Sequence, residues 1–142
     1  MPLEQWIGRA CLLGCDALER RSAVSADHVL AWETRHGRIE RGDIAVFEFG
    51  WWRKWALRPD DAAFLTDWPG LGLDCVELLL ERGVKAVGAD TLSPDVFGDA
   101  ASPVHKALLG EGGRHHRAGT RRRAGSIRRR ELHPAVANWL VT

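Results

Sequence analysis

The stretch between residues 73 and 88 constrains the fold more than any other part of the sequence, because a helical pattern leads through a glycine into an apolar run. Apolar residues recur at helical spacing at Leu73, Val76, Leu79 and Leu80. The pattern ends at Gly83, and the next five residues, Val-Lys-Ala-Val-Gly, suit a buried strand. A helix followed closely by a buried strand is half of a βαβ unit, so the sequence predicts an α/β fold.

Other segments in the first 112 residues agree with this fold class. Short apolar runs predict further strands near Cys11 and Val46, and helical patterns predict further helices over residues 26–35 and 104–109. The length of 142 residues and the hydrophobic content of 45% suit a single domain with its own core. We therefore expect residues 1–112 to form one α/β domain with a mixed sheet and flanking helices.

Residues 113–142 form a basic segment of different composition. From Arg114 onward the chain has eight basic residues and one acidic residue, a net charge of +7, whereas the preceding part has 12 basic and 18 acidic residues, a net charge of −6. The segment shows no helical or strand period, so we expect it to be disordered. Arginine triplets at 121–123 and 128–130 suit phosphate contacts, but no aromatic residue lies between them for base stacking. We therefore expect only weak, non-specific binding of polyanions.

The tail histidines and the cysteines predict neither a metal site nor a disulfide framework. The histidines lack a further ligand at a known zinc spacing; they are His115, His116 and His133. The cysteines are odd in number, lack a CxxC spacing and lie among apolar residues; they are Cys11, Cys15 and Cys75. This pattern indicates reduced thiols and a cytoplasmic protein. No apolar run approaches the roughly 18 residues of a membrane span, so we expect no membrane partner.

Two clusters of residues are compatible with either a functional site or a purely structural role. The first is Trp51-Trp52-Arg53-Lys54-Trp55, whose tryptophans could wall an aromatic pocket, stack on the neighbouring cations or pack at a domain edge. The second follows the predicted strand near Val87, where α/β folds often place site residues, and consists of Asp90, Thr91, Ser93 and Asp95. Capping of the next turn suits these four side chains better than catalysis does. His105, on a short predicted helix beside apolar residues, would by itself be a structural residue.

Three blocks follow one another between residues 42 and 112: GDIAVFEFGWWRKW, GLGLDCVELLLERGVKAVGADTLSPDVFGD and SPVHKALLGEG. In content and order they resemble the cyclase family of metal-dependent hydrolases, whose best-known members are bacterial kynurenine formamidases. The resemblance covers Pro2 to about Gly112. It implies an α/β protein that binds a divalent metal, zinc or manganese, and hydrolyses an amide or lactone-like bond in a small carbonyl substrate, as arylformamidases do in tryptophan catabolism.

The resemblance also indicates which site residues are absent from this sequence. The family signature HxGTHxDxP, which supplies two histidines and an aspartate as metal ligands, has no counterpart here. The block PVHKALL matches one that carries a metal-ligand histidine, which implies His105 as a ligand. The family's glutamate ligand would follow 12 residues later, where this sequence has Arg117. We therefore expect an incomplete domain that begins after the signature, with one metal ligand, no catalytic residue of its own and no hydrolase activity.

A shift of the reading frame near codon 112 would explain the basic tail. If residues 113–118, Gly-Arg-His-His-Arg-Ala, were encoded GGT CGT CAT CAT CGA GCN, the same bases read one position later would encode Val-Val-Ile-Ile-Glu. The glutamate would then occupy position 117, at the family's spacing from His105. We therefore interpret residues 113–142 as a segment that is out of frame.

Two further expectations concern partners. An incomplete domain would leave sheet edges and apolar faces open, which predicts self-association into homo-oligomers. The alternative to a hydrolase is a small non-catalytic binding protein whose cationic C-terminal arm contacts nucleic acid. Binding to DNA that depends on salt and is lost on deletion of residues 114–130 would favour this alternative.

Overall fold

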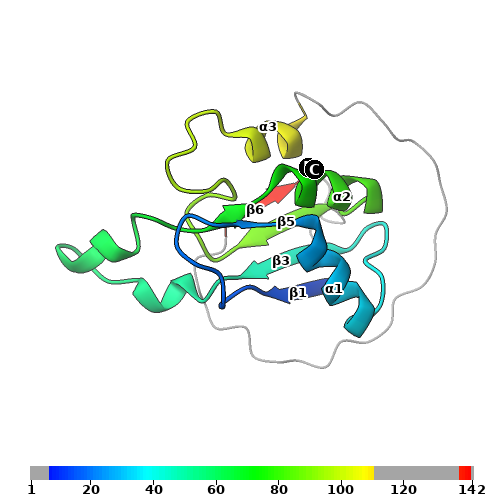
Figure 1. Ribbon diagram of the computed structural model, residues 1–142, viewed down its shortest axis with the longest axis horizontal. Coiled ribbons are helices and arrows are strands. Elements are labelled where there is room, and N and C mark those ends of the chain that lie inside the picture. The colour runs from blue at the N-terminus through cyan, green and yellow to red at the C-terminus, as the bar shows by residue number, and fades with distance from the viewer. Residues whose placement is uncertain (1–6, 111–137, 142) are drawn as a thin grey trace.

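The computed structural model describes residues 7–110 and 138–141, and its centre is a four-stranded mixed sheet (Figure 1). Three parallel strands lie in the order β1 (Ala10–Gly14), β3 (Ile44–Glu48) and β5 (Ala86–Ala89). The fourth strand, β6 (Asn138–Val141), pairs with β5 in the antiparallel direction. The mixed sheet that the sequence predicts is therefore confirmed.

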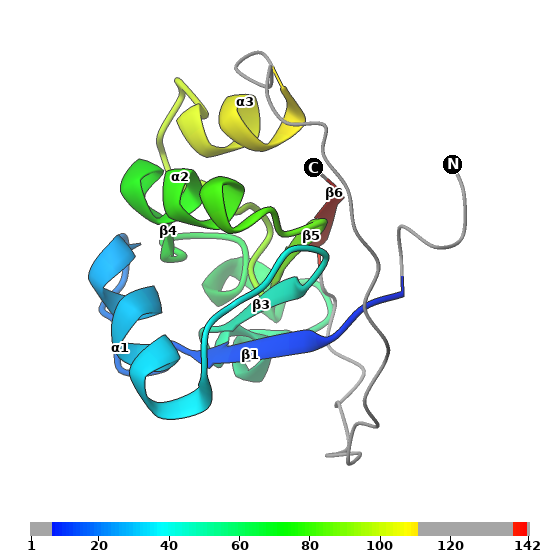
Figure 2. The same cartoon turned by 90° about the vertical axis from the view of Figure 1, so that its right-hand side faces the viewer.

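Three helices lie on one face of this sheet, as the side view in Figure 2 shows. They are α1 (Ala26–His36), α2 (Leu73–Arg82) and α3 (Pro103–Leu109). Helix α2 ends at Gly83, whose left-handed conformation (φ 73°) lets the amides of Gly83 and Val84 bond to carbonyls of the last turn. The chain then enters β5, so the helix, glycine and strand lie in the order that the sequence predicts.

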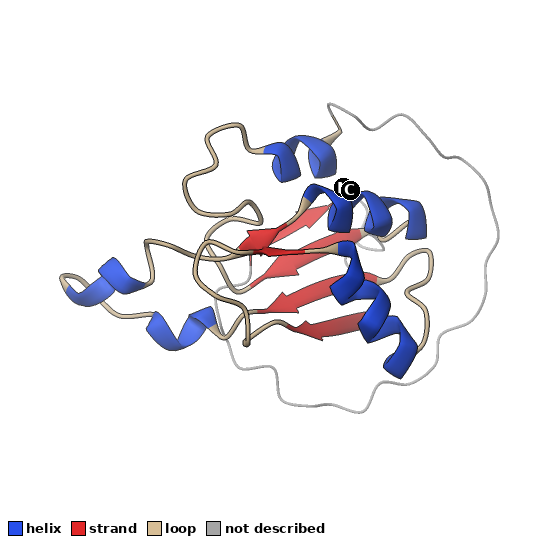
Figure 3. Cartoon of the chain, in the orientation of Figure 1, coloured by secondary structure: helices blue, strands red, loops and turns tan. Residues whose placement is uncertain are grey.

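The predicted elements of the first 112 residues are confirmed, and Figure 3 shows their arrangement. The strands expected near Cys11, Val46 and Val87 are β1, β3 and β5, and the three expected helices agree with α1, α2 and α3 to within one residue at each end. A second sheet, which the sequence pattern does not predict, consists of the two short parallel strands β2 (Ala23–Val24) and β4 (Gly70–Leu71). These strands have two residues each, too few to show a period.

The core lies between the four-stranded sheet and the helices. Alternate residues of the three parallel strands are buried there: Cys11, Leu13, Ala45, Phe47, Val87 and Ala89. They form one apolar cluster with residues of the helices, among them Val29, Val76, Leu79 and Leu108. The three cysteines are buried in this cluster as free thiols, in agreement with the sequence. Burial raises the pKa of Cys11 to about 11 and the pKa values of Cys15 and Cys75 to about 12.

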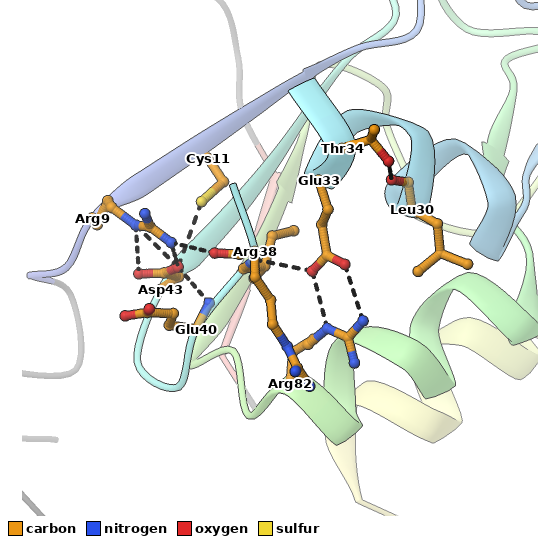
Figure 4. Close-up of polar contacts among 10 residues, drawn as sticks. Arg9, Cys11, Leu30, Glu33, Thr34, Arg38, Glu40, Asp43 and Arg82 are labelled. Carbon is orange, nitrogen blue, oxygen red and sulfur yellow. Dashed lines mark hydrogen bonds and ion pairs between the residues drawn. The ribbon is translucent and has the colours of Figure 1, made fainter. Parts of the chain in front are cut away.

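A polar network ties α1 and α2 to the beginnings of β1 and β3 (Figure 4). Asp43, just before β3, is buried and accepts hydrogen bonds from the Arg9 guanidinium (3.1 Å) and from the Glu40 amide (2.7 Å). Glu33 of α1 accepts two hydrogen bonds from Arg82 of α2, at 2.9 and 3.0 Å. These groups lie at the amino ends of the parallel strands, the opposite edge from the one where α/β sheets bind ligands, so we assign them to stability.

The strand β6 differs from the expectation that residues 113–142 have no regular structure. The run Trp-Leu-Val at 139–141 contains residues that favour strands, and β5 offers it an edge with unpaired backbone groups. The rest of the tail lies outside the described residues, and with it the arginine triplets, His115, His116, Arg117 and His133. In the part of the chain that the structure describes, no helix is long and apolar enough to cross a membrane.

Candidate functional site

The carboxyl ends of β1, β3 and β5 meet at one edge of the sheet, and two long connections leave from it (Figure 1). After β3 the chain forms two 3-10 helices, η2 (Trp51–Lys54) and η3 (Asp60–Ala63), which extend away from the sheet before the chain returns to β4. After β5 a loop leads to α3. Open α/β sheets bind ligands at this edge, which makes it the candidate site.

A carboxylate and an imidazole pair at this edge. Asp95, in the loop after β5, is 3% exposed, and its Oδ2 is hydrogen bonded to Nδ1 of His105 on α3. The same carboxylate accepts hydrogen bonds from the first turn of α3, from the Val104 amide to Oδ1 (2.7 Å) and from the His105 amide to Oδ2 (3.3 Å). The side chain of His105 is 36% exposed. Asp95 therefore caps α3, which begins eight residues further on, whereas the sequence predicts a cap on the next turn; it also holds the histidine ring.

The loop that carries Asp95 is held by contacts within it and with β4. The Asp95 amide donates to Ser93 Oγ (3.1 Å), and Thr91 Oγ1 donates to the Ser93 carbonyl (2.9 Å). The indole N–H of Trp68 donates to the Asp95 carbonyl (3.0 Å), and the Leu71 amide donates to the Pro94 carbonyl (2.7 Å). Sequence reasoning missed the role of Trp68, because its partner lies 27 residues away and no local pattern marks such a contact.

Asp90, directly after β5, caps a segment other than the one expected. Its carboxylate is buried and accepts hydrogen bonds from the amides of Phe49 (2.7 Å), Trp51 (2.6 Å) and Trp52 (3.3 Å). Asp90 thus caps η2, which follows β3, whereas the sequence predicts a cap on the turn that follows Asp90 itself. The reason is the sheet register, which places the end of β5 beside the end of β3.

The tryptophan cluster stacks on its neighbouring cations. Lys54 Nζ lies 3.1 Å from the centre of the Trp51 ring, and the Arg53 guanidinium lies 5.1 Å from the Trp52 ring. Trp51 is buried and donates from its indole N–H to the Phe64 carbonyl (2.9 Å). Trp55 is 54% exposed. The cluster therefore stabilises the connection after β3, which agrees with the stacking considered from the sequence.

The family model described as putative cyclase matches residues 1–96. The chain belongs to the cyclase family. This match confirms the resemblance carried by the first two sequence blocks, and it includes Asp90 and Asp95 but not His105.

Solved structures agree with the cyclase assignment. An isatin hydrolase bound to the product analogue thioisatinate is 26% identical, with a TM-score of 0.68 over 76% of this chain and 45% of its own. Isatin hydrolase A from Ralstonia solanacearum is 28% identical, with a TM-score of 0.69 over 78% of this chain and 46% of its own. A structure described as a novel cyclase is 25% identical, with a TM-score of 0.65 over 73% of this chain and 37% of its own. The cyclase chain thus spans less than half of each of these proteins. A comparison with curated proteins found no match.

The described residues of this cyclase chain do not fit a metal ion by themselves. Residues 7–110 and 138–141 contain no group of three or more histidine, cysteine, aspartate or glutamate side chains placed to hold a metal. Asp90 and Asp95 are buried, and the carboxylates of both accept hydrogen bonds from backbone amides. Nε2 of His105 makes no hydrogen bond to a described residue. Among the metal ligands that the sequence resemblance implies, it is therefore the one that the described part of the chain presents. A catalytic zinc normally takes about three protein ligands.

Proposed function

We propose that this chain is part of a cyclase-family hydrolase that cleaves an amide bond in a small aromatic carbonyl compound. The proposal rests on the buried carboxylate of Asp95, which is bonded to the partly exposed ring of His105 at the carboxyl edge of the sheet, in a chain of the cyclase family. The family match supports the class of reaction, and the edge where the pair lies is the one where α/β sheets bind ligands.

His105 is the proposed metal ligand of this chain, through Nε2. Its block PVHKALL supports this role by resemblance, and its Nδ1 is already bonded to Asp95, which leaves Nε2 for an outside partner. Zinc or manganese is the expected metal. The further ligands would come from residues outside the described part, because the described part does not assemble three.

Two substrates are candidates. N-formylkynurenine, the substrate of arylformamidases, follows from the resemblance of the three sequence blocks to kynurenine formamidases. Isatin, an aromatic cyclic amide, is favoured by the two isatin hydrolases at 26% and 28% identity. Both compounds carry an amide bond next to an aromatic ring, and hydrolysis of one but not the other by an active chain would separate the two candidates.

The 142 residues alone are proposed to be inactive. The sequence has no HxGTHxDxP signature, and position 117 holds an arginine where the family has a glutamate ligand. The tail of residues 113–142 is proposed to be a segment read out of frame.

The test is a hydrolysis assay of the purified 142-residue chain with N-formylkynurenine and with isatin, in the presence of zinc or manganese. We expect no turnover above a blank that contains the metal alone. Metal-dependent turnover that His105→Ala abolishes would contradict the account, because the chain would then assemble a complete site from its own residues. A control variant, His28→Ala, removes an exposed histidine of α1 whose ring contacts Ser25 rather than Asp95.

A further inference from the structure

We propose that Asp95 is a positioning residue that holds His105 as the Nδ1–H tautomer and so keeps a lone pair on Nε2. The importance of that lone pair rests on the proposed function, in which Nε2 of His105 meets the metal. The tautomer itself is a property of the chain without metal or substrate, so it can be tested separately.

The hydrogen bonds around the carboxylate determine which ring nitrogen carries the proton. An ionised carboxylate accepts hydrogen bonds and donates none. Oδ1 and Oδ2 of Asp95 already accept from the amides of Val104 and His105, which are donors at the start of α3. The ring nitrogen beside Oδ2 must therefore donate as well, which places a proton on Nδ1. A neutral imidazole has one N–H, so Nε2 is left with its lone pair.

The surroundings of Asp95 prevent the carboxylate from turning away. Its side chain is 4% exposed, and its backbone is bonded on both sides, from the amide to Ser93 Oγ and from the Trp68 indole to the carbonyl. The orientation of the Asp95 carboxylate toward the His105 ring is therefore fixed. Histidines that bind a metal through one ring nitrogen commonly donate the N–H of the other nitrogen to a carboxylate in this way.

Replacement of the Asp95 carboxylate by an amide should produce the opposite tautomer of His105. In Asp95→Asn the side-chain oxygen remains with the Val104 amide, which makes the shorter of the two backbone contacts. The new NH2 group then faces Nδ1 of His105 and can only donate to it. Nδ1 becomes the acceptor, and the proton moves to Nε2. In Asp95→Ser the hydroxyl can still cap α3 but no longer determines the tautomer, so the ring becomes a mixture of both forms.

The experiment is a two-bond ¹⁵N–¹H NMR spectrum of the histidine-labelled 142-residue chain, at a pH where the imidazoles are neutral. His105→Gln identifies the signals of His105 among the six histidines. We expect protonated Nδ1 in the wild type, protonated Nε2 in Asp95→Asn and a mixture in Asp95→Ser. The control Asp43→Asn changes another buried carboxylate, at the opposite edge of the sheet, and should leave the His105 signals as in the wild type.

A wild-type His105 with protonated Nε2 would overturn the proposal, and so would a folded Asp95→Asn chain that keeps protonated Nδ1. If Asp95→Asn does not fold, the wild-type spectrum and Asp95→Ser decide the question. If the proposed hydrolase function is wrong, these signals are still expected, because the sample contains neither metal nor substrate. The two proposals can therefore fail independently.

Discussion

The backbone of Asp95 passes directly against Gly70. A Cβ atom at position 70 would lie 2.5 Å from the carbonyl carbon of Asp95 and 2.5 Å from the Val96 nitrogen, closer than real Cβ contacts. The position of the Asp95 carboxylate, and that of the His105 ring beyond it, therefore depends on the absence of a side chain in β4. Glycine is required here by the close approach of two backbones.

The substitution Gly70→Ala should destabilise the chain by about 1–3 kcal/mol, because backbone atoms rather than a flexible side chain must move to accept the methyl group. Urea unfolding measures the change in the free energy of unfolding. The matched control is Gly14→Ala in β1, where a Cβ would meet nothing within 4 Å. The control should be neutral or slightly stabilising, since alanine costs less conformational entropy than glycine in a strand. Equal effects of the two substitutions would contradict the tight contact.

The ion pair between Glu33 and Arg82 should contribute strongly to stability, because the two side chains are only 10% and 14% exposed. Glu33→Gln leaves the Arg82 charge without a partner and should cost about 3 kcal/mol in urea unfolding. The control Asp61→Asn breaks a pair whose arginine, Arg58, is 91% exposed, and it should cost less than about 1 kcal/mol. A cost for Glu33→Gln as small as that of the control would contradict this assignment.

The same ion pair predicts part of the acid sensitivity of the chain. Hydrogen bonding from Arg82 holds the pKa of Glu33 below its ordinary value of about 4.3. A lowered pKa in the folded state means that the stabilisation is present above the ordinary pKa and is lost as the pH falls through the folded value. The free energy of unfolding should therefore fall less steeply with acid in Glu33→Gln than in the wild type.

The three cysteines should be unreactive in the folded chain, because burial raises their pKa values to about 11 for Cys11 and about 12 for Cys15 and Cys75. A thiol reagent at pH 8 should label none of them before unfolding and all three in concentrated urea. Raised pKa values also mean that their contribution to stability is complete below about pH 8.5 and is lost as the pH rises through 11 to 12. Rapid labelling of one thiol in the native chain would contradict the described burial.

The gene itself tests the interpretation of the tail. Helix α3 follows β5 and packs on α2, an arrangement that normally leads to a further parallel strand beside the sheet. The DNA of codons 113–118, read one base later, should encode Val-Val-Ile-Ile-Glu or a close relative. A shifted frame without an apolar run that ends in glutamate at codon 117 would refute the frameshift and leave the cationic arm as the better interpretation of the tail.

Local patterns in the sequence predict the fold better than they predict the site. Residues 73–88 carry their own helical period, a glycine stop and an apolar strand, so α2 and β5 can be located without knowledge of the rest of the chain. The sequence predicts that Asp95 caps the next turn, but the element that it caps, α3, begins eight residues further on.

Contacts between distant segments could not be predicted in this way. Asp90 binds amides 38 to 41 residues away, and Gly70 and Trp68 support Asp95 from another element. No periodic pattern encodes these contacts, because they depend on which strands become neighbours in the sheet. The partnership of Asp95 and His105 is intermediate, since the two residues are ten apart but meet only after a loop has turned back.

Hydrolysis by an extended chain tests most directly whether His105, held by Asp95, serves a metal-dependent hydrolase site. A cyclase-family segment with the HxGTHxDxP signature is fused ahead of residue 2, and one base is deleted near codon 112. We expect hydrolysis of N-formylkynurenine or isatin that requires zinc or manganese and falls by roughly 100-fold or more in His105→Ala. An extended chain that hydrolyses either substrate equally well with and without His105 would contradict the account.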